Sequence, residues 1–222
     1  MKLVLRFTLL TALAAAGLQA SVLTAPISGQ PPDTFGACAG CTQLAYLSIP
    51  TSNITNTLKF TFNTAVYTDP SNTFCAGCLD FDYQAINSAN STDDIGRITA
   101  ITFTGFQTDV GYSTAGEPAG GGTPFPTGTI APGFVDRNTA DVIGFQFSSS
   151  PSTVIAPGQT SAVLVIETNA TQFGAGFASI IDGGATNVAA FQPATGVPEP
   201  GSLALLGIGL AGLGGIRRFR RA

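Results

Sequence analysis

The chain contains no histidine and no tryptophan among its 222 residues, and only 10% of its residues are charged. Without histidine, neither a Ser-His-Asp triad nor a Cys-His nucleophile pair can form, and histidine metal sites are excluded as well. Without tryptophan, the chain lacks the favourite stacking platform of sugar-binding modules, although Tyr67, Tyr83 and Tyr112 could substitute for it. Paired carboxylates remain as catalytic groups that this chain could use.

Basic residues are also scarce, and most of the nine lie at the two ends of the chain. The six terminal ones are Lys2, Arg6, Arg217, Arg218, Arg220 and Arg221. Between the ends, Lys59, Arg97 and Arg137 stand against 13 acids, so this part of the chain carries about −10. Such a charge excludes binding to nucleic acid or to an anionic membrane surface by electrostatics, and it could attract divalent cations.

The C-terminal segment combines sixteen uncharged residues, 201–216, with a cluster of four arginines. As a helix, residues 201–216 would be about 24 Å long, which is at the short end of what spans a bilayer core. The arginines that follow mark the cytoplasmic side. A buried helix of a soluble core is the alternative, but six glycines would weaken such a helix in water. The pattern predicts a transmembrane helix with its tail inside.

Val197-Pro198-Glu199-Pro200 stands directly before this span, and residues 197–222 together resemble the PEP-CTERM sorting domain. Pro198, Glu199 and Pro200 match the family's tripeptide. Residues 201–216 match its span, and the anchor tail is matched by Arg217, Arg218, Arg220 and Arg221. The resemblance implies export, transient anchoring in the inner membrane and recognition by an exosortase, a membrane cysteine protease. It also implies association with bacteria that make exopolysaccharide, as in a biofilm matrix.

Residues 1–20 are typical of a signal peptide, which agrees with export. Lys2 and Arg6 give a positive start, residues 7–16 an apolar stretch, and Ala20 a small residue before the cut. An uncleaved N-terminal anchor is the alternative. Both ends together place residues 21–196 outside the cytoplasm, at the cell envelope or beyond it.

Residues 21–196 form one domain in which apolar and polar residues alternate with period two, without any run of helical period. This predicts an all-β fold, a β-sandwich of the immunoglobulin-like or jelly-roll-like kind. A stretch with three successive glycines and four prolines predicts a flexible loop at about 116–133. The expected strands are 44–49, 58–67, 79–83, 98–106, 142–147, 162–167, 173–181 and 188–191.

All four cysteines lie in two copies of Cys-Ala-Gly-Cys, which are Cys38 to Cys41 and Cys75 to Cys78. In an exported protein, paired cysteines are expected to form disulfides, and three connectivities are possible. Bridges within each motif would stiffen two turns, whereas bridges across the motifs would close a loop of about 37 residues and stabilise more. A four-cysteine zinc site is the metal alternative.

Two acid pairs, Asp80 with Asp82 and Asp93 with Asp94, are the candidates for carboxylate chemistry. Asp80 and Asp82 are two apart on an expected strand, so they share a face, which we expect to be the solvent face opposite Phe81. Asp93 and Asp94 lie in an expected turn that has no calcium-loop signature. The sequence therefore predicts no catalytic residue, no metal ligand and no cofactor.

Two functions are compatible with these features. The first is a non-enzymatic surface or matrix protein that is sorted by an exosortase and embedded in exopolysaccharide. The second is an exported carbohydrate-binding module or a glycosidase that uses paired carboxylates. Acids and aromatics gathered in one concave patch would favour the second function, and scattered acids over a smooth sandwich would favour the first.

Overall fold

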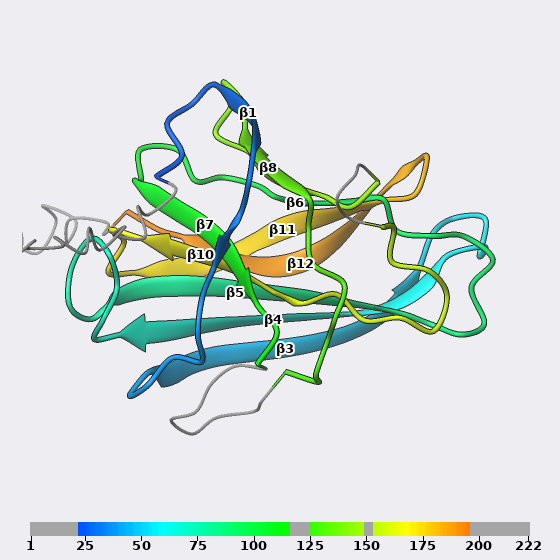
Figure 1. The fold of residues 1–222 in the computed structure, drawn as a ribbon, viewed down its shortest axis with the longest axis horizontal. Coiled ribbons are helices and arrows are strands. Elements are labelled where there is room, and N and C mark those ends of the chain that lie inside the picture. Colours follow the sequence, from blue (N-terminus) through cyan, green and yellow to red (C-terminus); the bar gives the residue numbers. More distant parts are fainter. Residues whose placement is uncertain (1–21, 116–124, 149–152, 196–222) are drawn as a thin grey trace, which may run out of the picture.

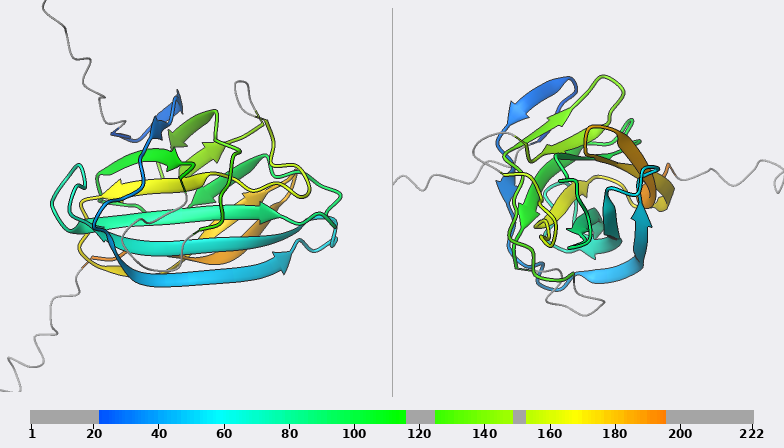
Figure 2. Two further views of the ribbon diagram at one scale, coloured as in Figure 1. Left: turned by 60° about the horizontal axis from the view of Figure 1, so that its bottom comes forward. Right: turned by 90° about the vertical axis from the view of Figure 1, so that its right-hand side faces the viewer.

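The computed structural model describes residues 22–115, 125–148 and 153–195, in which all regular elements are strands. Twelve strands form two six-stranded sheets that pack face to face (Figures 1 and 2). The first sheet has the order β1 (Ile27–Gln30), β8 (Phe134–Arg137), β9 (Ile143–Gln146), β6 (Arg97–Ala100), β11 (Phe173–Ile181), β12 (Ala185–Pro193). The second has the order β2 (Asp33–Thr34), β7 (Thr108–Ser113), β10 (Val163–Thr168), β5 (Cys78–Asn87), β4 (Lys59–Asp69), β3 (Thr42–Ser52). The prediction of an all-β sandwich is confirmed.

The alternation along β4 and β5 explains how the second sheet meets the first. Alternate side chains of a strand point to opposite faces. Phe62 of β4 and the pair Phe81 and Tyr83 of β5 therefore point inward, where all three are fully buried. The rings of Phe62 and Tyr83 stack with 6.0 Å between their centroids. The Tyr83 hydroxyl also donates a 2.7 Å hydrogen bond to the Phe191 carbonyl of β12, which links the two sheets.

The structure has more strands than the sequence predicted. Short strands β1, β2, β7 and β8 were missed because two to six residues are too few to show a clear period. The strand expected at 98–106 ends at Ala100, and Thr102 and Gly105 have φ angles of 77° and 84°. Positive φ does not fit an extended strand, so residues 101–106 turn toward β7 instead.

The outer face of the second sheet is covered by the segment that contains β2 and residues 35–41. β2 pairs with β7 as the only parallel pair among the described strands, and the chain then crosses the sheet toward β3. A second small core of Ala65, Tyr67, Phe125, Val163 and Val165 packs there with Cys41 and Phe35. Gly111 allows this approach, because a Cβ there would lie 2.4 Å from the Asp33 carbonyl oxygen. The second sheet is thus buried on both faces where residues 35–41 cross it.

The end of β8 is tied to the neighbouring loops by the buried guanidinium of Arg137. Its nitrogens donate hydrogen bonds to the carbonyls of Leu23, Phe103 and Phe106 at 2.9–3.1 Å. It also bonds the Thr108 hydroxyl at 2.9 Å and forms an ion pair of 2.9 Å with Asp141. Because one side chain satisfies three loop carbonyls, Arg137 fixes the entry of the chain into the sandwich.

Several predicted segments lie outside the described residues. They are the signal peptide at 1–20, the sorting domain at 197–222 with its transmembrane helix, and residues 116–124 of the expected flexible loop. The remaining part of that loop, residues 125–133, lies against the second sheet, with Phe125 buried and Ile130 bridged to Ser161. Within the described ranges, no helix is long and apolar enough to cross a membrane.

Candidate functional site

A row of acidic side chains crosses the outer face of the second sheet. Asp80 of β5 lies directly opposite Glu167 of β10, and Glu167 lies directly opposite Asp109 of β7. Directly opposed residues of an antiparallel pair put their side chains on the same face, about 4.5–5.5 Å apart at Cβ. Asp69, the last residue of β4, joins them, since its carboxylate oxygen lies within 4.8 Å of those of Asp80 and Glu167. We call Asp69, Asp80, Asp109 and Glu167 the acidic cluster.

Residues 70–77, which connect β4 to β5, fold over the acidic cluster and donate hydrogen bonds to it. The Asn72 amide bonds the Asp80 carboxylate at 2.7 Å. The Thr73 backbone N–H bonds Glu167 at 2.9 Å, and the Thr73 hydroxyl bonds Asp109 at 3.3 Å. Ser71 donates two hydrogen bonds to one oxygen of Asp69, at 2.6 and 2.7 Å. Residues 70–77 therefore cover the acidic cluster and keep its carboxylates close together through these hydrogen bonds.

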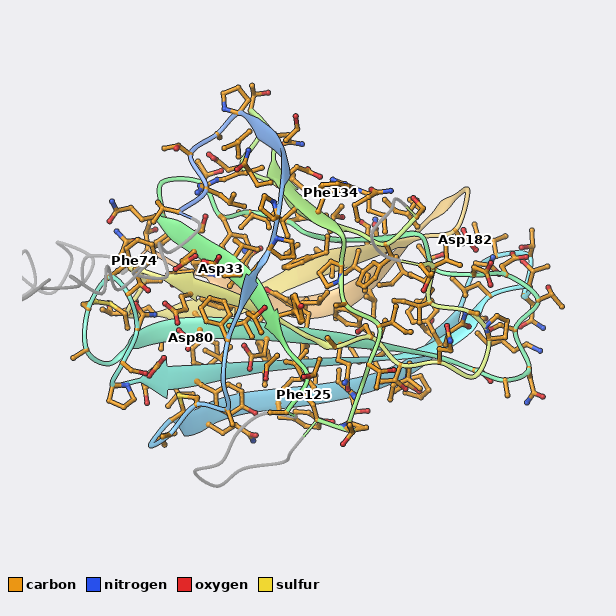
Figure 3. All side chains as sticks on the ribbon, in the orientation of Figure 1. Asp33, Phe74, Asp80, Phe125, Phe134 and Asp182 are labelled. Atoms are coloured by element: carbon orange, nitrogen blue, oxygen red, sulfur yellow. A yellow bond between two sulfur atoms is a disulfide. The ribbon has the colours of Figure 1, made fainter. Side chains whose placement is uncertain are left out.

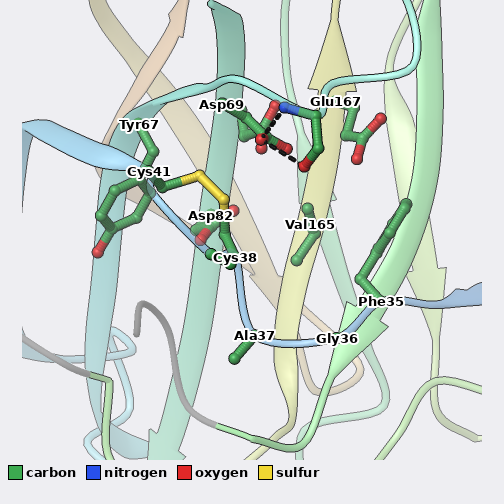
Figure 4. A pocket seen from close by; sticks show the side chains of 13 residues that line it. Phe35, Gly36, Ala37, Cys38, Cys41, Tyr67, Asp69, Asp82, Val165 and Glu167 are labelled. Atoms are coloured by element: carbon green, nitrogen blue, oxygen red, sulfur yellow. Dashed lines mark hydrogen bonds between the residues drawn. A yellow bond between two sulfur atoms is a disulfide. The ribbon is translucent and has the colours of Figure 1, made fainter. Parts of the chain in front are cut away.

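Residues 35–41 close the site from the other side and leave a pocket of about 230 Å³ (Figure 4). The Cys38–Cys41 disulfide and the ring of Phe35 line it together with Tyr67 and Val165 of the second small core. Its polar wall consists of Asp69, Asp80, Asp82, Glu167 and Ser71. The pocket is smaller than the roughly 300–1,000 Å³ of usual small-molecule sites.

The prediction that Asp80 and Asp82 face solvent is wrong. The two residues do share a face, as expected, but they are only 5% and 3% exposed. Alternation places a side chain on a face without showing what covers that face. Here the covering comes from residues 35–41, which are far from β5 in the sequence, and from residues 70–77, whose Asn72 bonds Asp80. The rest of the acidic cluster is buried to a similar degree, between 1% exposed for Asp109 and 6% for Glu167.

Burial and repulsion between neighbouring acids raise the pKa values of three members of the acidic cluster, Asp80, Asp109 and Glu167. Burial, followed by the charges of Asp82, Glu167 and Asp69, raises the pKa of Asp80 to about 10 against the hydrogen bond from Asn72. Burial and the neighbouring Asp33 and Glu167 raise the pKa of Asp109 to about 6. Burial also raises the pKa of Glu167 above its usual value. Burial of these three carboxylates is therefore favourable only when protons or a cation reduce their negative charge.

The basic residues of the described part of the chain do not neutralise the acidic cluster, because they pair with other acids or lie far from it. Arg97 forms a bidentate ion pair with Asp136, with N–O distances of 2.6 and 2.7 Å. Arg137 pairs with Asp141. Lys59 is the first residue of β4 and Asp69 the last, so they are separated by the length of an 11-residue strand, about 33 Å. No ion pair joins a basic residue of the described ranges to Asp69, Asp80, Asp109 or Glu167.

Both Cys-Ala-Gly-Cys motifs form disulfides within the motif, which decides among the three connectivities. Cys38 bonds Cys41 and Cys75 bonds Cys78, with Cα–Cα distances of 5.6 and 5.3 Å. No cysteine is left free. Because zinc binds thiolates, these paired sulfurs do not offer the four-cysteine zinc site of the alternative. Both disulfides flank the acidic cluster, one in residues 35–41 and the other at the end of residues 70–77.

The model of a known family, described as a PEP-CTERM protein-sorting motif, matches residues 196–221. This chain carries a PEP-CTERM motif. The expectation drawn from Pro198, Glu199, Pro200 and the arginine tail is thereby confirmed, and the motif indicates a protein that is exported and sorted by an exosortase. No curated protein and no solved structure matches the chain.

The other predicted acid pair, Asp93 and Asp94, lies away from the acidic cluster. Asp93 and Asp94 help to line a second pocket with Asp182 and Arg97. Figure 3 shows Asp182 and Asp80 toward opposite ends of the sandwich. Asp182 accepts a 2.9 Å hydrogen bond from Asn53. This bond joins the loop between β11 and β12 to the loop that follows β3. The structure thus separates the two acid pairs, with Asp182 beside Asp93 and Asp94, and with Asp69, Asp109 and Glu167 gathered around Asp80.

Sequence reasoning missed Asp69, Glu167 and Asp109 as partners of Asp80. Asp69 and Glu167 lie in or beside expected strands, so their faces could be inferred from alternation, whereas Asp109 lies in β7, which was not predicted. The order and register of the strands could not be inferred, because the contacts in the cluster join residues far apart in the sequence. Thr73 and Glu167, for example, are hydrogen-bonded but 94 residues apart. Chemically, the arrangement can hold protons between carboxylates or bind a hard cation.

Proposed function

We propose that the β-sandwich is the non-enzymatic ectodomain of a surface or extracellular-matrix protein that associates with exopolysaccharide. The PEP-CTERM motif supports the route, in which residues 201–216 anchor the protein in the inner membrane until an exosortase cuts near the motif. The absence of histidine from the whole sequence supports the lack of catalysis, because it removes the usual general base of a nucleophile. No cofactor is required for such a role.

The burial of the paired carboxylates is the observation that carries this proposal. A glycosidase places two carboxyl groups on either side of a bound glycosidic bond, about 5–9.5 Å apart. Asp80 and Asp82 lie at most 5% exposed beneath residues 35–41, and a pocket of about 230 Å³ leaves little room for a polymer. A polysaccharide strand would reach these acids only if residues 35–41 moved away.

The proposed association with exopolysaccharide is weak and depends on divalent cations. The surplus of acids gives the protein a net negative charge of about −10 between its ends, which would repel an anionic glycan. Calcium ions that bridge surface carboxylates to the glycan would overcome the repulsion. Bridging of this kind is a surface effect and needs no buried site.

Two assays on the exported protein test the proposal together. In a pull-down with the producer's own exopolysaccharide, we expect retention with calcium and its loss with a chelator. In a reducing-end assay with the same polysaccharide, we expect no product. Retention that persists unchanged in chelator would contradict calcium bridging, and release of reducing ends would contradict the non-enzymatic role.

A carbohydrate hydrolase is the second candidate, and one specific observation favours it. Four acids gather with the aromatic rings of Phe35 and Tyr67 in one concave patch, which is the arrangement expected of a carbohydrate-active site. The raised pKa of Asp80 would suit a general acid beside Asp82. If turnover is found and Asp80→Asn or Asp82→Asn abolishes it while Asp94→Asn does not, this candidate replaces the first.

A further inference from the structure

We propose that Asp69, Asp80 and Glu167 bind one calcium ion inside the acidic cluster, where it joins β4, β5 and β10. Their carboxylate oxygens lie within 4.8 Å of one another. Calcium binds oxygen ligands at 2.3–2.6 Å, so two ligands of one ion are at most about 5 Å apart. The three oxygens therefore already have the spacing that a shared calcium ion requires. This inference goes beyond the proposed association with exopolysaccharide and does not depend on it.

Asp109 supplies a second and independent indication of a ligand. Its side chain is 1% exposed, and its Oδ1 atom has no hydrogen-bond partner among the described residues. Asp109 lies directly opposite Glu167, and its other oxygen, Oδ2, accepts a hydrogen bond from Thr73, which also donates to Glu167. A buried oxygen without a partner destabilises the fold, and more so when it is charged. A cation beside Glu167 would remove that cost, either directly or through a bound water.

The negative charge of the acidic cluster favours a positive group at the same place. Buried carboxylates are expected to be paired with a base or to coordinate a metal. Arg97 and Arg137 pair with Asp136 and Asp141, and Lys59 lies at the far end of β4. No side chain of the described ranges that carries a positive charge is thus available to the acidic cluster. A divalent cation would offset two of its negative charges at once.

The donor atoms select calcium over zinc and magnesium. All the donors are oxygens, because the sulfurs of Cys38 and Cys41 are joined in a disulfide. Magnesium demands nearly ideal octahedral geometry and keeps most of its water. Calcium accepts six to eight oxygens in irregular geometry, and the pocket of about 230 Å³ has room for waters that complete its shell. The Ser71 hydroxyl, which bonds Asp69, is a further oxygen at the rim.

The bound ion would act as a cross-link of the outer face. Its three ligands come from the end of β4, from β5 and from β10. Both loops that cover them are held by a local disulfide, at Cys38–Cys41 and Cys75–Cys78. Because an ion that binds only the folded chain stabilises it, calcium is expected to raise the unfolding temperature.

The test uses the full chain, freed of divalent ions with EDTA and then titrated with calcium chloride alone. Isothermal titration calorimetry is expected to give one calcium per chain. The unfolding temperature is expected to rise by roughly 5–10 °C at a hundredfold excess over Kd. No binding heat and no shift up to about 10 mM calcium, which exceeds the Kd of weak extracellular sites, would overturn the proposal. Magnesium binding as tight as calcium binding would overturn the choice of ion.

Matched variants locate the site. Glu167→Gln and Asp80→Asn keep the shape of the side chain and are expected to weaken calcium binding at least roughly tenfold. Asp94→Asn makes the same change in charge on an exposed residue away from the cluster and is expected to leave Kd within about twofold. Circular dichroism in EDTA checks that each variant folds, which we expect because neither substitution adds charge or volume to the core. Equal calcium affinity in wild type and in both cluster variants would place the ion elsewhere and sink the proposal.

Discussion

Asp80 and Glu167 lie directly opposite each other on β5 and β10, with both carboxylates buried and neither bonded to a basic residue of the described ranges. Like charges in directly opposed positions destabilise a sheet. The pair is kept in place by hydrogen bonds from Asn72 and Thr73, which donate to one carboxylate each. This arrangement makes the stability of the sandwich depend on protons and on cations, and the first prediction follows from it.

In calcium-free buffer, we expect the free energy of unfolding to fall as the pH rises from about 5 to about 8. The pKa of Asp80 is raised from 3.8 to about 10 in the folded protein, so the folded state holds a proton that the unfolded chain releases. The stabilisation from the protonated Asp80 side chain is complete below pH 3.8 and is lost as the pH rises to about 10. Over this range the free energy of unfolding falls by at most about 1.4 kcal/mol per pH unit. Asp109 adds to the loss between 3.8 and about 6.

Urea unfolding at several pH values in EDTA measures this dependence. Asp80→Asn is neutral at every pH and still accepts a hydrogen bond from Asn72, so it is expected to flatten the profile. Asp94→Asn, on the exposed surface, is the control and is expected to follow wild type. A wild-type protein that becomes more stable between about pH 5 and 8 would show that the cluster is ionised and favourably paired.

Tryptic peptide mapping without reduction is expected to find each disulfide within its own motif. Lys59 is the only basic residue between Cys41 and Cys75, so trypsin separates the two motifs. Bridges within the motifs give two separate peptides, each lacking two hydrogens. A bridge across the motifs would keep the two peptides linked until reduction, and finding that would contradict the structure.

Replacement of Cys75 and Cys78 by serine is expected to cost about 2 kcal/mol of stability, as closure of so short a loop implies. A bridge across the motifs would be worth roughly 3–4 kcal/mol in the same treatment. Guanidinium unfolding of the variant and of wild type provides the comparison. A loss above about 4 kcal/mol would mean that this disulfide holds more than its own turn.

Arg137→Ala is expected to destabilise the sandwich by about 3–5 kcal/mol, as removal of a partner from a buried ion pair does. The substitution leaves Asp141 without its arginine and the carbonyls of Leu23, Phe103 and Phe106 without their donor. Lys59→Ala removes one positive charge from β4 and is expected to change stability by no more than about 0.5 kcal/mol. Chemical unfolding compares the two, and a loss below about 1 kcal/mol for Arg137→Ala would contradict the structural role.

Replacement of Pro198 and Glu199 by alanine is expected to leave the full-length chain in the membrane fraction. The two residues belong to the tripeptide of the matched sorting motif, which we propose that an exosortase recognises. Fractionation followed by mass spectrometry of both termini gives the position of the protein and of each cut. Replacement of Pro193 and Thr195 by alanine, outside the motif, is the control. Normal cleavage and release of the Pro198/Glu199 variant would show that recognition lies elsewhere.

The sequence by itself determined that the protein carries a sorting motif and that its fold is all-β. The sorting motif is a contiguous run of residues at one end, and the all-β fold follows from alternation within single strands such as β4, β5 and β11. Both are local patterns, and local patterns can be recognised without knowledge of the tertiary structure. The pairing of cysteines was left open, because spacing alone permits three connectivities.

Only the tertiary structure decided where the acids lie. Alternation placed Asp80 and Asp82 on one face, but residues 35–41 cover that face through contacts that no local pattern indicates. Strand order and register then brought Glu167 and Asp109 beside Asp80, across loops whose path is set by packing of the whole core. A side chain expected in water thus became part of a buried acidic cluster, because burial depends on the neighbours that the fold supplies and not on the strand itself.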